Sequence, residues 1–374
     1  MARYTGPIVD VDIHHTWTSP TEIIDYLPQR WRDYVNGDGR TRTSVAPPSS
    51  HVFTLLDAVG TRLDAMPEVG PAGSDHDLLR AQLFDRYVDD YRGVMTFNIG
   101  AEAGHFNPYL SAALCEAINT WNVERWLPRD DRFYGSLLLP SNNVEACVAE
   151  IHRLGDHPRM VGVLFPINPM GRPLGDLAFH PIYEACVEHD LSLELHVNSA
   201  DTASVRSGVG TPGSYLEHSI RLSDPAMHYL TSVIVNGVFE TYPALRMLVK
   251  EYGTTWLPHM IWKLDKSYEM LRLESPWVKK RPWDYIHSNI KFSTQPLEVS
   301  RDAEARWVEL MSTVDGIDDV LCFSSDYPHY QFDHPLEIAR MLPTAWREKI
   351  MYRNSCELFN WPVPVDRPPV AAQA

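Results

Sequence analysis

Short apolar runs alternate with longer amphipathic segments along most of the chain. Eight runs are nearly continuous in apolar character, as expected for strands that are covered on both faces of a sheet. They span residues 7–15, 92–98, 133–140, 160–167, 191–198, 246–253, 289–295 and 320–327. Between them we expect helices at residues 108–126, 142–154, 181–190, 215–241, 254–273, 302–312 and 335–341. This alternation predicts parallel strands joined by right-handed crossovers.

Eight such units favour a closed (β/α)8 barrel, a TIM barrel, over an open doubly wound sheet. No Gly-x-Gly-x-x-Gly pattern follows the first strand, so a dinucleotide-binding sheet loses its main support. Residues 16–90 are too long for one connection, and we interpret them as an insertion after the first strand that caps or lines the active site. We expect residues 1–361 to form a single domain and the Pro/Ala-rich residues 362–374 to be a loose tail.

Composition and charge narrow the function classes. The 374 residues are 44% hydrophobic and 22% charged, which is ordinary for a globular protein. A net charge of −16 argues against nucleic acid as a partner, because neutralising phosphates needs clustered Lys and Arg. No apolar stretch of about 18 residues predicts a membrane span. The five cysteines are widely spaced and no apolar leader precedes the first strand, so we expect reduced thiols and a cytoplasmic protein.

Ionisable residues gather at the carboxyl ends of three predicted strands, where barrel enzymes keep their catalytic groups. Asp12 and His14 end the first strand and share one face, because side chains alternate along a strand. His196 ends the fifth apolar run, and Asp326 ends the eighth. Any one of these residues alone is more often a capping or packing residue. Together they predict a metal site.

The chemistry of this set points to catalysis. Imidazole nitrogens and carboxylate oxygens suit zinc, iron or manganese, and the absence of thiolates disfavours a structural zinc site. A divalent ion with an open position lowers the pKa of bound water to about 7. Asp326 could bind the ion, accept a proton from that water, or do both in turn.

The chain resembles the amidohydrolase-related proteins of the amidohydrolase superfamily, the branch that includes aminocarboxymuconate semialdehyde decarboxylase and γ-resorcylate decarboxylase. The resemblance covers the chain from about residue 7 to residue 361. It is carried by VDVDIHH (9–15), SDHDLLRAQLFDRY (74–87), LELHV (193–197), GVFETYPALRMLVKEYGTTWLP (237–258), FSTQP (292–296) and FSSDYPH (323–329).

The resemblance implies a distorted (β/α)8 barrel that holds one divalent ion, with zinc the first choice and manganese or iron as alternatives. Asp12, His14, His196 and Asp326 match the family's ligand positions. The binuclear members of the superfamily use a carboxylated lysine on the fourth strand, and residues 160–167 contain no lysine. We therefore expect a mononuclear site.

One position departs from the well-known decarboxylases, which end the sixth strand with a catalytic histidine. Glu251 stands there instead. It could act as a general base, bind the metal, or orient His196 or His14. The alternative without a role in catalysis is a salt bridge with Lys250 or Arg246.

Two enzyme functions remain open, both acting on a small-molecule substrate. We expect a hydrolase in which Asp326 and Glu251 are the catalytic residues and metal-activated water attacks a cyclic or aromatic substrate. The alternative is a non-oxidative decarboxylase of an aromatic or enoic acid. A binding protein without catalysis is disfavoured because all four ligand positions are filled. A homodimer is expected by analogy with relatives. Candidate substrate-binding residues are His180, His329, Trp256 and Arg172.

Overall fold

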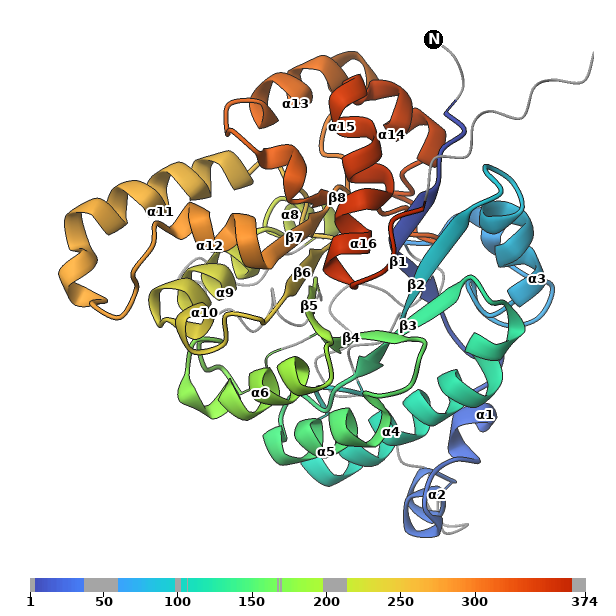
Figure 1. The fold of residues 1–374 in the computed structure, drawn as a ribbon. Coiled ribbons are helices and arrows are strands. Elements are labelled where there is room, and N and C mark those ends of the chain that lie inside the picture. Colours follow the sequence, from blue (N-terminus) through green and yellow to red (C-terminus); the bar gives the residue numbers. More distant parts are fainter. Residues whose placement is uncertain are drawn as a thin grey trace, which may run out of the picture.

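The structure, a computed structural model, describes residues 4–36, 60–97, 102–105, 107–166, 168, 170–197 and 214–364. Eight parallel strands form one sheet in the order in which they occur along the chain, which confirms the predicted barrel (Figure 1). The strands are β1 (Ile8–His15), β2 (Tyr91–Phe97), β3 (Phe133–Leu138), β4 (Met160–Phe165), β5 (Ser192–His196), β6 (Met247–Lys250), β7 (Ile290–Ser293) and β8 (Leu321–Cys322).

The barrel closes between its last and first strands. β8 has two residues, but the chain continues along β1 beyond them: Val11 N donates to Phe323 O at 3.1 Å, and Asp326 N donates to Asp12 O at 3.1 Å. The Asp10 carboxylate strengthens this seam by accepting a hydrogen bond from Ser325 N at 2.9 Å. These hydrogen bonds place the end of β8 at the same rim of the barrel as the end of β1. The ionisable residues at the ends of both strands therefore lie at that rim.

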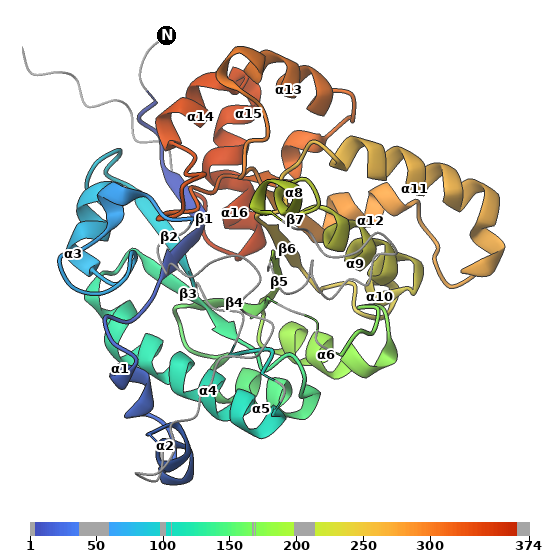
Figure 2. The same ribbon diagram turned by 180° about the vertical axis from the view of Figure 1, so that it is seen from behind.

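Helices surround the strands in both views (Figures 1 and 2). They are α1 (Thr21–Ile24), α2 (Gln29–Asn36), α3 (His76–Leu79), α4 (Pro108–Trp121), α5 (Val144–Leu154), α6 (His180–Glu188), α8 (Tyr215–Ser219), α9 (Asp224–Val235), α10 (Val238–Thr241), α11 (Leu257–Leu271), α12 (Pro282–Asn289), α13 (Glu304–Met311), α14 (Pro335–Met341), α15 (Thr344–Glu348) and α16 (Asn354–Leu358). Five-residue π-helical turns follow α3, α4 and α15 at Arg80–Phe84, Asn122–Trp126 and Lys349–Arg353.

Local chemistry sets several of these boundaries. α4 begins where the Asn107 side chain accepts hydrogen bonds from the backbone of Tyr109 and Leu110, with Pro108 in the first turn. The predicted helix 215–241 is instead three helices, α8, α9 and α10. Pro225 lies in the first turn of α9, and Gly237 adopts a left-handed φ of 74° between α9 and α10, as a helix-ending glycine does.

The insertion after β1 runs along the rim of the barrel in its described part. Thr61 pairs with His329 as an isolated antiparallel bridge, and Arg62 N donates to Pro328 O at 2.8 Å. The insertion therefore contacts the loop that follows β8, in keeping with an active-site loop. Residues 37–59 of the insertion lie outside the described residues, and so do residues 365–374 of the predicted tail.

All five cysteines are free and buried, in agreement with the reduced thiols that the sequence predicts. None of the helices in the described ranges is long and apolar enough to span a membrane.

Candidate metal centre

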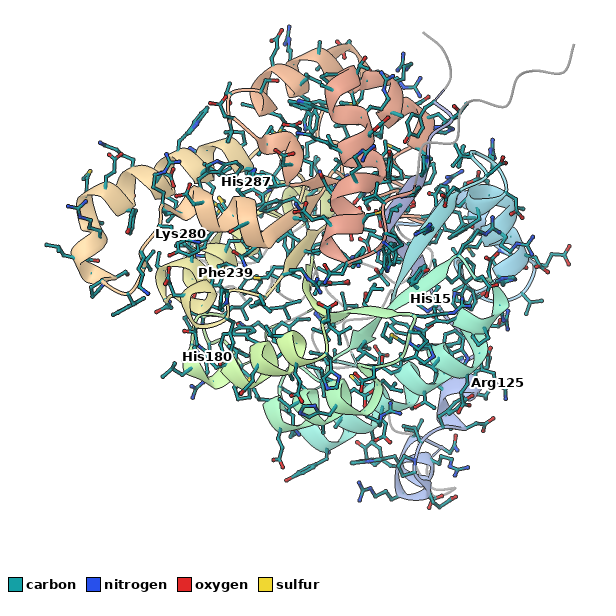
Figure 3. The ribbon with its side chains drawn as sticks, viewed as in Figure 1. His15, Arg125, His180, Phe239, Lys280 and His287 are labelled. Carbon is teal, nitrogen blue, oxygen red and sulfur yellow. The ribbon has the colours of Figure 1, made fainter. Side chains whose placement is uncertain are left out.

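β1 brings Asp12 and His14 to the rim through an irregular register with β2. Between the pairs Asp10–Gly93 and Ile13–Met95, β1 has two residues where β2 has one, which marks a bulge in the strand. Bulges re-aim side chains next to functional sites. Asp12 and His14 are both fully buried within one group of potential ligands, whereas His15 turns outward and packs against the rings of Phe97 and Trp126 (Figure 3).

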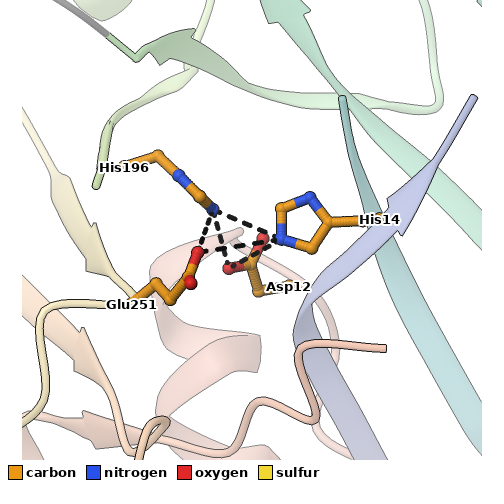
Figure 4. Close-up of side chains that lie close together, drawn as sticks. All are labelled: Asp12, His14, His196 and Glu251. Carbon is orange, nitrogen blue, oxygen red and sulfur yellow. Dashed lines mark hydrogen bonds and ion pairs between the residues drawn. The ribbon is translucent and has the colours of Figure 1, made fainter. Parts of the chain in front are cut away.

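His196 and Glu251 complete this group from β5 and from the residue that follows β6. His196 Nε2 lies 3.1 Å from Glu251 Oε2, 3.3 Å from Asp12 Oδ2 and 3.4 Å from His14 Nε2 (Figure 4). The other ring nitrogen, His196 Nδ1, hydrogen-bonds to the Val197 carbonyl at 2.7 Å, which turns Nε2 toward the group. The four side chains each offer one ligand atom within a sphere that a single ion could fill.

Asp326 and His329 form a second, overlapping group with His14 and Glu251. Asp326 Oδ1 lies 3.0 Å from His14 Nε2 and 2.6 Å from His329 Nδ1. Its other oxygen accepts a hydrogen bond from Gln295 Nε2 at 2.7 Å. Asp326 therefore links the predicted ligand set to a histidine and to an amide that come from the ends of β8 and β7.

Burial and neighbouring charges divide the histidines into two kinds. Burial, and then the charge of His329, lower the pKa of His14 to about 3, so its ring is neutral at pH 7. Burial also acts to lower the pKa of His329, but the Asp326 carboxylate outweighs it and raises the value to about 9. Burial also acts to lower the pKa of His196, but Asp12 and Glu251 outweigh it and the net shift is upward. The metal-free centre thus holds one neutral histidine, His14, beside two whose pKa is raised.

The carboxylates respond to the same neighbours. Burial alone raises the pKa of Asp12, but the charges of Lys250, His196 and His14 outweigh it and the net shift is downward. Burial raises the pKa of Asp326, and the opposing charge of His329 offsets only part of that shift. Asp12 is therefore ionised at neutral pH, as a ligand must be.

The residues fit a divalent ion. Neither carboxylate oxygen of Asp12 accepts a hydrogen bond from the described part of the chain, although both are buried. Buried polar atoms in proteins are normally hydrogen-bonded, so these two oxygens, which make only ion pairs with Lys250, His196 and His14, have free lone pairs that fit a cation. Two imidazole nitrogens and two carboxylate oxygens are a donor set for zinc, manganese or iron.

Residues 9–361 match the amidohydrolase family model. The chain belongs to the amidohydrolase family. The match spans β1 to the end of the last helix, in agreement with the resemblance seen in the sequence. No curated protein matches this amidohydrolase.

Solved structures share the fold at low sequence identity. An amidohydrolase from Mycobacterium avium subsp. paratuberculosis K-10 is similar with a TM-score of 0.71 and 18% identity, covering 94% of this chain and 99% of that one. 2,6-Dihydroxybenzoate decarboxylase from Rhizobium gives 0.64 and 18%, covering 95% and 99%. 5-Carboxyvanillate decarboxylase from Novosphingobium aromaticivorans DSM 12444, solved with manganese, gives 0.62 and 18%, covering 95% and 98%.

Three of the predicted substrate residues of this amidohydrolase lie outside both ligand groups. His180 begins α6 in the helical layer and packs against the rings of Tyr183 and Tyr242 (Figure 3). Arg172 is half-exposed and pairs with Asp176 at 3.4 Å. Trp256 is buried, and its indole N–H donates to the backbone carbonyls of residues 252 and 253. The fourth, His329, lies within the centre.

The structure adds three polar residues that the sequence left without a role at the centre. Lys250 and Glu194 are fully buried beneath Asp12, and Gln295 contacts Asp326. The alternative interpretation, a salt bridge of Glu251 with Lys250 or Arg246, is wrong: Lys250 pairs with Glu194 and Asp12, and Arg246 pairs with Asp190. The sequence does contain a signal for Lys250. A lysine within the apolar run MLVK indicates a buried, ion-paired residue, since buried lysines are rare and paired.

Proposed function

We propose that this amidohydrolase is a metal-dependent carboxy-lyase that removes CO2 from a small aromatic or enoic carboxylic acid. The sequence alone favoured hydrolysis over this alternative. The observation that now favours decarboxylation is the acid beside the ligand group, the His329–Asp326 pair joined at 2.6 Å. The fold neighbours that are decarboxylases support the same choice.

The chain's own residues supply what this reaction needs. When the carbon–carboxylate bond breaks, its electron pair stays on carbon, and that carbon must take a proton as CO2 leaves. Protonated His329, held at Nδ1 by Asp326, is the proposed proton donor. Gln295 fixes the other Asp326 oxygen, so the pair keeps one orientation.

One divalent ion is proposed to be held by Asp12, His14, His196 and Glu251, with Asp326 adjoining. It would supply a Lewis acid that binds the substrate carboxylate and a neighbouring oxygen. Zinc is the sequence-based choice, and manganese is the ion in two decarboxylase neighbours. Elemental analysis of purified protein tests the proposal. We expect close to one equivalent per chain, and protein that holds none after reconstitution contradicts it.

A panel of aromatic and enoic acids, assayed for CO2 in D2O, tests the reaction. We expect CO2 release with one deuterium placed on the carbon that lost the carboxylate. The variant His329→Asn should lower turnover by about 10²–10⁴-fold, the usual contribution of a general acid. His180→Asn, which changes a histidine outside both ligand groups, is the matched control and should retain activity.

Hydrolysis is the second candidate, because Glu251 replaces a histidine and its carboxylate lies 3.1 Å from His196 Nε2. A carboxylate there could accept the proton of an attacking water. Turnover of amides or lactones without CO2 release from any acid in the panel would favour this reading. The cytoplasmic location, the single domain and the homodimer remain predictions.

A further inference from the structure

Lys250 is a cation buried inside the barrel beneath the proposed metal position. It is the last residue of β6 and its side chain is fully buried. Its Nζ lies 2.7 Å from Glu194 Oε2, 2.9 Å from Thr96 Oγ1 and 3.6 Å from Asp12 Oδ1. A buried ammonium is costly unless it is paired and hydrogen-bonded, so these three contacts explain how the lysine is tolerated.

The barrel is shaped to hold Glu194, the main partner of this lysine. Ser136 Oγ donates to Glu194 Oε2 at 2.6 Å, and Ser192 Oγ lies 3.3 Å from Oε1 while it also lies 3.1 Å from the Val161 carbonyl. β4 leaves the necessary room through Gly162, where an added Cβ would lie 2.1 Å from Glu194 Oε1. With Thr96, five strands, β2 to β6, thus contribute to one buried ion pair.

The Lys250–Glu194 pair contacts only one of the two carboxylate oxygens of Asp12. Asp12 Oδ1 faces Lys250, while Oδ2 faces His196 at 3.3 Å and His14 at 3.9 Å. The two oxygens of this carboxylate are therefore divided between an internal cation and the metal group.

We propose that Lys250, balanced by Glu194, is a positioning residue that holds Asp12 with Oδ2 toward the bound ion and so sets the affinity for that ion. This inference rests on the proposed metal site. Two effects of Lys250 oppose each other, because its charge repels a cation while its contact orients a ligand. Since Glu194 cancels the charge nearby, orientation dominates, and removing the pair weakens metal binding by about 10–100-fold, as loss of such partners does in metalloproteins.

The decisive variant removes both charges together. Lys250→Met with Glu194→Gln leaves the net charge unchanged and neither member of the pair alone, while Asp12 keeps its ion pair with His196 at 3.3 Å. The dissociation constants for Mn²⁺ and Zn²⁺ are measured by competition with a chromogenic chelator, and folding is checked by circular dichroism. The matched control is Lys291→Met with Glu357→Gln. That pair, on β7 and α16, joins a largely buried lysine to a glutamate at 2.9 Å and belongs to neither ligand group. Its affinity should stay within about twofold of wild type.

The outcomes separate this inference from the metal site itself. Wild-type protein that binds no ion overturns both. Wild-type binding with unchanged or tighter binding in the folded double variant overturns the role of Lys250 alone. Should the double variant fail to fold, Thr96→Val removes one hydrogen bond from Lys250 and keeps both charges. It should weaken binding by about threefold or more, and unchanged affinity there also overturns the inference.

Discussion

At the scale of residues, Glu251 and Asp326 share an uncommon backbone conformation. Their φ angles are 61° and 55°, in the left-handed region that residues with a Cβ rarely adopt. Glu251 directly follows β6 and Asp326 lies in the segment after β8, and each turns the chain into the following loop. The strain is on the order of 1–2 kcal/mol per residue, and such residues cluster at functional sites. Asp190 and Asn360 have the same conformation, with φ of 57° and 53°, so it is not specific to the site. The catalytic roles of Glu251 and Asp326 stay a prediction.

Replacing Glu251 by glutamine should weaken metal binding at least tenfold, because a neutral amide would replace a carboxylate in the ligand group. Competition with a chelator measures the change. Glu298→Gln is the control, since Glu298 accepts hydrogen bonds from the backbone of Thr254 and Thr255 and supports the same loop without belonging to the group. Equal losses in both variants would assign Glu251 a supporting role only.

The His329–Asp326 pair predicts a pH-dependent stability in the metal-free protein. The folded pKa of His329 is raised to about 9, so its contribution is complete below about pH 6.5 and is lost as the pH rises through 9. The difference in unfolding free energy between wild type and His329→Asn should be on the order of 2–3 kcal/mol at pH 6 and fade toward pH 10.

Chemical denaturation in the presence of EDTA measures this difference across the pH range. His180→Asn is the control, because its pH dependence has the opposite sign. Burial lowers the pKa of His180, so the unfolding free energy of wild type should rise relative to that of His180→Asn as the pH rises. A constant difference between wild type and His329→Asn at all pH values would show that the ion pair does not form.

At the scale of elements, the seam between β8 and β1 depends on the C-terminal helices. Asn354 at the start of α16 donates to the carbonyls of Leu321 at 2.6 Å and Asp318 at 2.7 Å, and Phe323 N donates to Ile350 O at 2.8 Å. These contacts secure the shortest strand, whose end carries Asp326. None of them is visible in the periodicity of residues 342–361, for which the sequence predicted no helix.

Asn354→Ala should lower the free energy of unfolding by about 2–3 kcal/mol, because two buried carbonyls lose a donor. Denaturant titration measures the loss. Asn236→Ala is the matched control: this exposed asparagine also donates to a carbonyl, that of Ser232, and should change stability by no more than about 0.5 kcal/mol. Similar values for the two variants would mean that α16 does not stabilise the seam.

At the scale of the whole molecule, the proposed ion joins distant parts of the barrel. Its ligands come from β1, from β5 and from the end of β6, and the second group adds the loop after β8. An ion that binds only the folded chain stabilises it by mass action, by about 2.7 kcal/mol at one hundred times its dissociation constant. Metal binding and barrel stability should therefore be coupled.

Removing the metal with EDTA should lower the melting temperature by roughly 5 °C, and adding Mn²⁺ or Zn²⁺ should restore it. Scanning calorimetry measures both. His196→Asn should abolish the response to added metal, because it removes the ligand nearest to both Asp12 and Glu251. A wild-type melting temperature that does not change when EDTA is added would contradict a metal centre that stabilises the barrel.

The sequence by itself determined the eight strands, their parallel order and the residues at their ends. Burial on both faces gives strands a continuous apolar run, and the parallel order puts every carboxyl end on one rim. Asp12, His14, His196 and Asp326 could be predicted as neighbours for that reason. The family resemblance added Glu251, as the position where this chain differs from the catalytic histidine of the well-known decarboxylases.

Only the tertiary structure decided which other polar residues reach that rim. Spacing along the chain does not show how a strand is rotated within the barrel or where a loop returns. It therefore does not show that His329 and Gln295 contact Asp326, whereas His180 packs against Tyr183 and Arg172 pairs with Asp176. The same holds for Lys250 and Glu194, on neighbouring strands of the closed barrel. They meet beneath Asp12 because closure points both side chains inward, which no single segment of sequence encodes.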